Sequence, residues 1–279
     1  MSTTPLQVPA PELAAQDDDW TVPPPREHPG RVAALLLAAA FGTTAALSAL
    51  GSLTAPTEST TRELAGTVRV VRALSEVGDV DVRVVPGLDA ARVTTTTHGS
   101  WSQPRAEAEL LGDGVLQLSG DCGDAAWFWP CSVSFELELP AAVPLEFRTQ
   151  TGDVDVDGAF PSVVAELTTG DFGWEHPAGG TLDLRSTTGD VDVEGAVSDL
   201  RVRATTGDVD VELRQAPERV VVETTTGDVH VELPADGTGY DADVSAGVGD
   251  VTDDVPVDPD GPLLQVRATT GDVTVRAEG

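Results

Sequence analysis

LEFRTQTGDVDV, residues 145–156, holds the six-residue pattern that dominates this chain, Thr-Gly-Asp-Val-x-Val. The pattern recurs with variations towards the carboxyl terminus, and its glycine falls at positions 152, 170, 189, 207, 227, 249 and 271. Spacings of 18 to 22 residues between these glycines indicate repetition of one small structural unit. Periods of this length are typical of solenoids, in which each unit stacks on its neighbours.

Apolar residues alternate with polar ones on both sides of each glycine. In the fourth copy, Leu200 and Val202 precede Gly207, and Val209 and Val211 follow it. Alternation with period two predicts strands that bury one face. Each copy should therefore form a strand, a tight Gly-Asp turn, a second strand and a loop. Stacking such units about 4.8 Å apart would bury every apolar face in one core.

The turn residues have physical reasons of their own. A sharp corner often needs a positive φ, which glycine reaches without steric cost. The aspartate that follows can accept backbone N–H hydrogen bonds within the corner. Four residues before each glycine, outward-facing charges of opposite sign should pair between coils and help to set the stacking register. These positions are Arg148, Glu166, Arg185, Arg203, Glu223, Ser245 and Arg267.

Two places depart from the simple array. Gly78 and Asp79 have the same apolar flanks, Val71 and Ala73 before them and Val80 after, and so predict an additional amino-terminal copy. Near the carboxyl terminus, Val248 replaces the threonine and Asp253 occupies an inward position. The sixth coil is therefore expected to be distorted.

The stretch LPAAVPLEFRTQTGDVDVDG, together with the repeated TTGDVDVE, resembles the bacterial "putative adhesin" family of β-solenoid domains, related to toastrack-type domains. The resemblance covers about residues 66–279. It implies a solenoid fold and a location at the cell surface more than it implies an activity. Some members of that family are tied to envelope-stress signalling.

The amino-terminal part predicts a membrane anchor. Residues 1–30 are rich in proline and charge, typical of a disordered polar tail, which we place on the cytoplasmic side. Residues 31–55 contain an apolar run long enough to span a bilayer as one helix. Cleavage near Ala46–Ala49, as in a signal peptide, is the alternative. Residues 56–65 would be a linker, and residues 66–279 an extracellular solenoid with an insertion at about 87–140.

The net charge limits the classes of possible partner, and the two cysteines bear on the cellular compartment. The formal net charge of −31 excludes general nucleic-acid binding, because the chain would repel phosphates. The two cysteines, Cys122 and Cys131, lie close together in the part placed outside the cell. An oxidising compartment would let them form a disulfide that closes a short loop.

The sequence contains two candidate binding sites, and each also has a purely structural explanation. Stacked carboxylates repel one another, and Ca²⁺ would relieve that repulsion; otherwise the same aspartates only cap turns. The proposed calcium face consists of Asp153, Asp171, Asp190, Asp208 and Asp228. Within the cysteine loop, Trp127, Phe128 and Trp129 could contact a partner or sugar, or could cap the open end of the solenoid.

No catalytic constellation is evident in the sequence. Acidic residues are spread throughout, the four histidines are scattered, and no nucleophile elbow, metalloprotease motif or phosphate-binding loop is present. We therefore expect an all-β, short-coil β-solenoid, similar to a single-stranded β-helix, carried by one amino-terminal transmembrane helix. Its expected function is non-catalytic: adhesion or protein interaction at the cell surface, with a surface protein or wall polymer as partner and no cofactor. A self-assembling envelope component is the alternative, and a polysaccharide-acting enzyme is a remote one.

Overall fold

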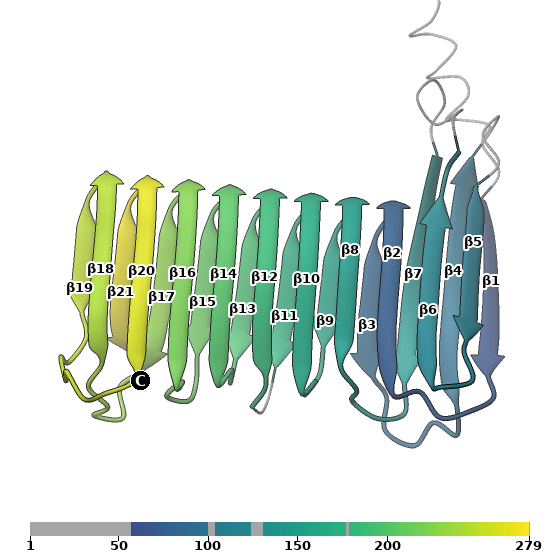
Figure 1. Ribbon diagram of the computed structural model, residues 1–279, viewed down its shortest axis with the longest axis horizontal. Helices are drawn as coiled ribbons and strands as arrows, with labels where there is room; N and C mark the ends of the chain where they lie inside the picture. Colours follow the sequence, from purple (N-terminus) through teal and green to yellow (C-terminus); the bar gives the residue numbers. More distant parts are fainter. Residues whose placement is uncertain (1–56, 100–103, 124–130, 177–178, 279) are drawn as a thin grey trace, which may run out of the picture. The chain divides into compact units, whose positions relative to one another are not determined.

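A computed structural model describes residues 57–99, 104–123, 131–176 and 179–278 of the chain. These residues all belong to one compact unit, residues 46–279. They form strands β1–β21, arranged in two sheets that face each other (Figure 1). The all-β solenoid expected from the repeat is confirmed.

Sheet A has eleven strands and sheet B has ten. Sheet A runs in the order β1 (Thr57–Leu64), β4 (Ala91–Gly99), β7 (Cys131–Leu139), β3 (Val80–Val84), β9 (Val154–Asp157), β11 (Phe172–His176), β13 (Val191–Gly195), β15 (Val209–Leu213), β17 (Val229–Pro234), β21 (Val273–Glu278) and β19 (Val251–Asp254). Sheet B runs in the order β18 (Asp241–Val248), β20 (Leu263–Thr270), β16 (Arg219–Thr226), β14 (Asp199–Thr206), β12 (Thr181–Thr188), β10 (Ser162–Thr169), β8 (Leu145–Thr151), β2 (Val70–Val77), β6 (Val115–Asp121) and β5 (Arg105–Leu110).

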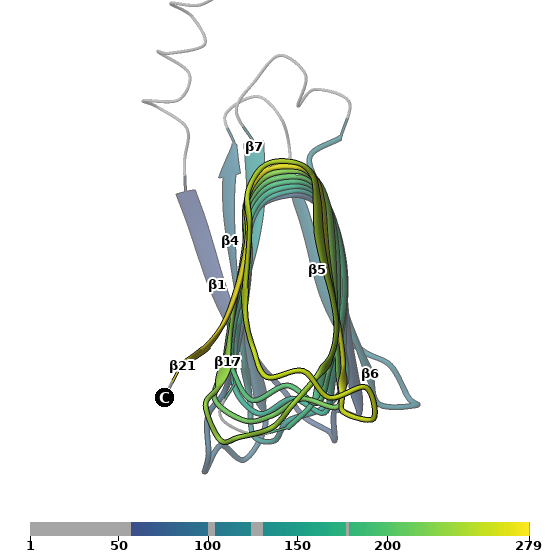
Figure 2. The ribbon, with the colours of Figure 1, turned by 90° about the vertical axis from the view of Figure 1, so that its left-hand side faces the viewer.

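Each repeat contributes one strand to each sheet. Seen along the stack, the coils superimpose as a flattened tube, with a smooth corner at one narrow end and irregular loops at the other (Figure 2). Neighbouring coils pair in parallel with equivalent residues opposite one another, as in Val191↔Val209 and Leu184↔Val202. The alternating apolar residues point into the tube, where Val202 and Val211 are fully buried. One continuous core therefore connects all the coils.

The smooth corner is where the Gly-Asp pair turns the chain from sheet B into sheet A. At Gly207, φ is +139°, a conformation that side chains other than glycine rarely adopt. A Cβ atom there would also lie 2.0 Å from the carbonyl oxygen of Gly189 in the adjacent coil. The Gly189 N–H in turn donates to the carbonyl oxygen of Thr206 at 3.0 Å. Glycine is thus required both by the turn and by the coil-to-coil contact.

The amino-terminal copy predicted at Gly78 is present. Strands β2 and β3 stack directly on β8 and β9, with Val80 opposite Val154. The inserted strands extend the stack beyond this copy: β6 pairs with β2, and β7 pairs with β3. Strands β5 and β4 then add antiparallel to β6 and β7, so the insertion forms an amino-terminal end with a different topology from the coils.

Residues 56–65 differ from the expected linker. Thr57–Leu64 form strand β1, which pairs antiparallel with β4 as the outermost strand of sheet A. In the structure, seven of the eight residues of the segment TESTTREL are exposed, and only Leu64 is apolar. Its polar composition therefore resembles that of a linker even though it adopts a strand.

The carboxyl-terminal coils are stacked out of sequence order. The last coil, β20 and β21, lies between the fifth coil and the sixth, so β18 and β19 form the outer end of the stack. The inward-facing residues of the two coils explain this order. Val266 and Val275 of the last coil are apolar and fully buried inside the stack, whereas Asp253 of the sixth coil is charged and stays exposed at its end. The sixth coil is regular rather than distorted, and its unusual residues face solvent.

The expected tail, residues 1–30, and transmembrane helix, residues 31–55, lie outside the described residues. Within the part that the structure describes, no helix is long and apolar enough to cross a membrane.

The corner contact predicts the effect of adding one methyl group. Gly207→Ala should lower the free energy of unfolding by more than about 1 kcal/mol, because it combines an unfavourable φ with a backbone clash. Gly112→Ala is the matched control, since a Cβ there meets nothing within 4 Å. Urea unfolding monitored by circular dichroism measures both. Equal stability of the two variants would contradict the corner geometry.

Candidate functional site

The aspartates of the corners form a continuous ladder. In each central corner, the Oδ1 atom of one aspartate accepts the backbone N–H of the aspartate in the next coil at 2.8 Å. We call this set the Asp ladder, and it consists of Asp79, Asp153, Asp171, Asp190, Asp208, Asp228, Asp272 and Asp250. The carboxylate supplies an acceptor where the turning backbone offers no carbonyl. The five predicted calcium ligands thus form one row along the stack, with one carboxylate per coil, and each accepts a backbone hydrogen bond from the next coil.

The ladder changes character at the amino-terminal coil. There the N–H of Asp79 donates to the hydroxyl of Ser134 at 3.3 Å, and its Oδ1 accepts from Asp153 at 3.1 Å. Ser134 belongs to β7, which reaches sheet A through the cysteine loop instead of a Gly-Asp corner. A side-chain acceptor is therefore retained where the repeat itself ends.

Calcium binding by Asp153, Asp171, Asp190, Asp208 and Asp228 stays a prediction. In the described part of the chain, no three acidic, histidine or cysteine side chains lie close enough together to hold a metal ion. One oxygen of each of these five carboxylates is already a hydrogen-bond acceptor. A calcium ion would have to use the remaining oxygens, along the stack.

The outer face of sheet A is acidic. Between the inward valines, Asp155, Asp192 and Asp210 point outwards, and Glu194 and Glu212 form a second column beside them. Partial burial, reinforced by neighbouring carboxylates, raises the pKa of Asp155 above its ordinary value. Burial likewise raises the pKa of Asp81 and of Asp210, which occupy the equivalent outward position in other coils. This face should repel acidic partners.

The outer face of sheet B has a different charge pattern. Glu166 lies between Arg148 and Arg185 and pairs with them at 3.2 and 3.4 Å. Arg203 pairs with Glu223 at 3.0 Å. The predicted pairing of outward charges between coils is therefore confirmed here. Each pair is largely exposed, so it contributes little to stability and leaves its polar groups accessible.

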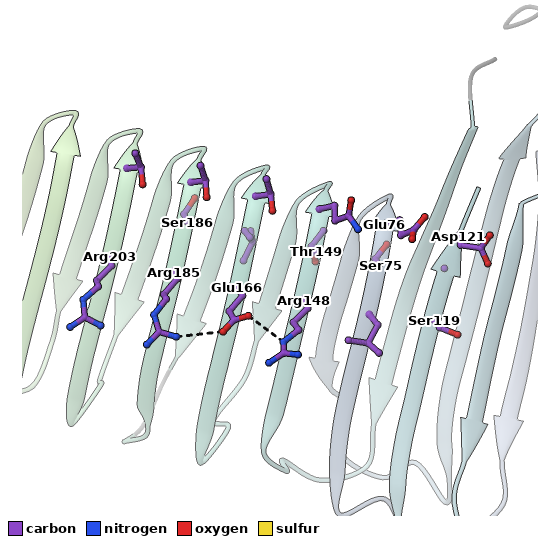
Figure 3. A pocket seen from close by; sticks show the side chains of 17 residues that line it. Ser75, Glu76, Ser119, Asp121, Arg148, Thr149, Glu166, Arg185, Ser186 and Arg203 are labelled. Carbon is purple, nitrogen blue, oxygen red and sulfur yellow. Dashed lines mark hydrogen bonds and ion pairs between the residues drawn. The ribbon is translucent and has the colours of Figure 1, made fainter. Parts of the chain in front are cut away.

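A groove of about 890 Å³ crosses the outer face of sheet B from β6 to β14 (Figure 3). One wall carries Arg148, Glu166, Arg185 and Arg203, and the other carries Gln150, Thr168, Thr187 and Thr205. Backbone atoms of the strands form its floor, because these two rows occupy alternate outward positions. We call it the sheet B groove. The charged row was anticipated from the sequence, but its partner row of threonines was not. The repeated Thr-Thr-Gly triplet was the available signal.

The predicted disulfide is present. Cys122, just after β6, is bonded to Cys131 at the start of β7. The bond therefore links sheet B to sheet A where the other coils have a Gly-Asp corner. Trp127, Phe128 and Trp129 lie outside the described residues, so their proposed roles in capping or partner contact stay predictions.

One protein-family model matches the carboxyl-terminal repeats. Residues 141–276 match the family model "Toastrack DUF4097". No curated protein sequence matches the chain.

Three solved structures are similar at low identity. They are a "putative cell adhesion protein" from Clostridium sporogenes (14% identity, 81% of this chain and 100% of that one, TM-score 0.39), a "putative adhesin" from Bacteroides fragilis (14%, 80% and 97%, TM-score 0.49) and a "putative adhesin" from Parabacteroides distasonis (13%, 80% and 98%, TM-score 0.30).

The raised pKa values of the sheet A aspartates predict a pH effect on stability. A carboxyl whose pKa is higher in the folded state favours folding when protonated, and this contribution is lost as pH rises through the folded pKa. Asp155→Asn with Asp210→Asn should therefore raise the melting temperature at pH 7. The gain should shrink as pH falls towards the ordinary aspartate value of about 3.9.

Melting curves between pH 4 and pH 8 measure this difference. Glu138 has a lowered pKa because it accepts hydrogen bonds from Arg83, so it acts in the opposite direction in both proteins and cancels in the comparison. A double variant that is less stable than the parent at pH 7 would contradict the prediction.

Proposed function

We propose, on the premise that residues 141–276 belong to the toastrack DUF4097 family, that this chain is a non-catalytic surface module for adhesion or molecular interaction. Its solenoid would hold an extended partner, a wall polymer or a protein segment, against the outer face of sheet B. The sheet B groove is the observation that carries the proposal. It offers a recurring set of polar groups rather than a single pocket.

The dimensions of the groove suit an extended chain. It crosses six neighbouring strands, from β6 to β14, which at about 4.8 Å per strand gives a length of roughly 24 Å. Hydroxyl groups of Thr168, Thr187 and Thr205 recur once per coil along one wall. A polymer with its own repeating polar groups could make the same contact several times. A rigid stack also loses little conformational freedom on binding.

Charge favours sheet B over sheet A for this contact. Within a chain of net charge −31, the groove brings together Arg148, Arg185 and Arg203. Glu76, Asp121 and Glu166 balance these charges, so the groove is nearly neutral, in contrast to the acidic face of sheet A. The arginine N–H groups that Glu166 and Glu223 leave unused could donate hydrogen bonds to a polymer or protein segment that carries carboxylates. The acidic face of sheet A would disfavour the same partner.

A non-catalytic role agrees with the chemistry of the groove. Its only described carboxylates are Glu76, Asp121 and Glu166, and Glu166 is paired with two arginines. Because it is paired with two arginines, Glu166 is not an isolated carboxyl of the kind that serves as a general acid. Turnover of a polysaccharide by the purified protein would contradict this part of the proposal.

Anchoring belongs to the same proposal. Residues 31–55 would hold the chain in the cell membrane as a single-pass helix, with the solenoid outside and residues 1–30 inside. A tail inside the cell would allow a bound solenoid to take part in envelope sensing. The disulfide supports an extracellular position, because disulfides persist in oxidising compartments.

Removing the groove arginines should weaken binding to wall polymer. Arg148→Gln, Arg185→Gln and Arg203→Gln together remove three cationic donors, each able to make hydrogen bonds of about 1.5–3 kcal/mol with a charged group. Retention of the full-length protein on purified bacterial cell-wall sacculi should fall at least about tenfold. Cosedimentation measures the bound fraction.

The matched control removes three exposed arginines that do not line the groove, Arg105, Arg267 and Arg276. It changes the net charge by the same amount and should keep its binding. Equal losses in the two triple variants would show that charge alone, and not the groove, determines retention. Absence of binding by the parent protein would exclude sacculi as the partner.

Topology is tested in intact cells. A cysteine introduced at Thr225, in an exposed part of the solenoid, should react with a membrane-impermeant maleimide, whereas one introduced at Ser2 should react only after lysis. Labelling of the Ser2 position in intact cells would contradict the proposed orientation. Recovery of a mature protein that lacks residues 1–45 would instead support a cleaved signal peptide.

A further inference from the structure

Strand β1 leaves one long edge of sheet A unpaired. It is the first strand of that sheet and pairs only with β4, so its other edge meets no strand among the described residues. Sheet B has no counterpart opposite it, because its last strand, β5, belongs to the preceding layer. Viewed along the stack, β1 lies beyond β4, outside the flattened tube (Figure 2). An exposed edge of this kind is a template for pairing with another strand.

The opposite end of the stack is protected against a second copy. The sixth coil and its connections, residues 235–262, contain eight aspartates and no basic residue. Two such ends would repel each other strongly. Strand β1 differs, since TESTTREL carries both signs of charge: Glu58, Glu63 and Arg62.

We propose that β1 pairs antiparallel with β1 of a second copy of this chain, joining the two A sheets across a two-fold axis. Isologous contacts of this kind are the commonest in symmetric assemblies. The charge pattern of the strand identifies the partner. When two copies of the strand run antiparallel, the negative charge of one faces the positive charge of the other.

Geometry restricts the register. Successive residues of a strand alternate both in the face they occupy and in the edge towards which their N–H and C=O groups point. Two identical antiparallel strands can therefore pair only when each residue lies opposite one of the same parity. Thr60 opposite Thr60 meets this condition and overlaps residues 57–63 of both copies.

This register places Glu58 opposite Arg62 of the second copy, and Arg62 opposite Glu58. Within the described residues, neither side chain has an ion pair in the single chain, although Glu63 is bound by Arg92. A shift by two residues in either direction loses both pairs, placing Glu58 opposite Leu64 or Thr60. Both charges therefore specify the same arrangement, and opposite charges at facing positions stabilise an antiparallel pair.

The two charges also share one face. Glu58, Thr60 and Arg62 line a recess of about 210 Å³ together with Ala106 and Ala108 of β5. Arg62 lies opposite the buried Val93, so this is the inward face of sheet A. In the joined sheet the inward faces of both copies lie on the same side. The crossed ion pairs would then lie in the space between the two B sheets, partly shielded from water.

Charge exchange tests the proposal in the full-length protein. Glu58→Arg places arginine at both positions 58 and 62, and Arg62→Glu places glutamate at both. Each variant should lose self-association at least about tenfold, because like charges then face each other. Mixed together, the two variants should bind each other about as well as the parent binds itself. The double variant Glu58→Arg with Arg62→Glu should also self-associate.

Co-capture of two differently tagged copies from detergent solution measures each combination. Glu107→Arg and Arg105→Glu on β5 change the charge equally at the same end of the stack and should leave self-association unchanged. Loss of association in both single variants without recovery in the mixture or the double variant would overturn the proposal. A parent protein that is monomeric up to high micromolar concentration would overturn it as well.

Discussion

The solenoid depends on the close approach of its corners. At the corners from Gly152 to Gly271, a glycine without a Cβ allows the carbonyl oxygen of the neighbouring corner to come within 1.9–2.3 Å of where that atom would be. The approach brings the backbone into hydrogen-bonding distance, and the aspartate after the glycine supplies the acceptor that the turning chain lacks. Coil spacing, parallel register and burial of the valines all follow from this contact. One short pattern, repeated, therefore determines a whole rod.

A fixed register also determines the surfaces. Because equivalent residues lie opposite each other, any preference at one position of the repeat becomes a row along the stack. Aspartate and glutamate between the valines make sheet A acidic, whereas arginine and threonine make the walls of the sheet B groove. The interior is nearly uniform, so the differences between coils that matter for partners are on the outside. A binding role for sheet B is the functional reading that this division favours.

The repeat made much of this predictable from the sequence. The strands around each glycine and the additional copy at Gly78 were inferred from spacing and alternation, since those patterns report local backbone geometry. The disulfide was inferred separately, from two cysteines close in the sequence and an oxidising compartment. The order of the last two coils was not predictable in the same way. It depends on which coil can place Asp253 in water, which requires a comparison between stacking arrangements. The sequence marked the place by Val248, by Asp253 at an inward position and by two spacings of 22 residues, but none of these gives the order. Strand β1 was missed because its polar residues contribute to an edge, where alternation is absent, and the threonine row was missed because its residues also belong to the turn motif.

Amide hydrogen exchange of the corner aspartates reports directly on the contact between neighbouring corners. The N–H groups of Asp190, Asp208 and Asp228 lie in exposed residues, yet each donates to a carboxylate of the adjacent coil. These amides should exchange nearly as slowly as those of the buried valines beside them. Asp208→Ala should accelerate exchange at Asp228 far more than at Asp190, because the Asp208 carboxylate accepts the Asp228 N–H. Rapid exchange of all three amides in the parent protein would contradict the corner contact on which the solenoid depends.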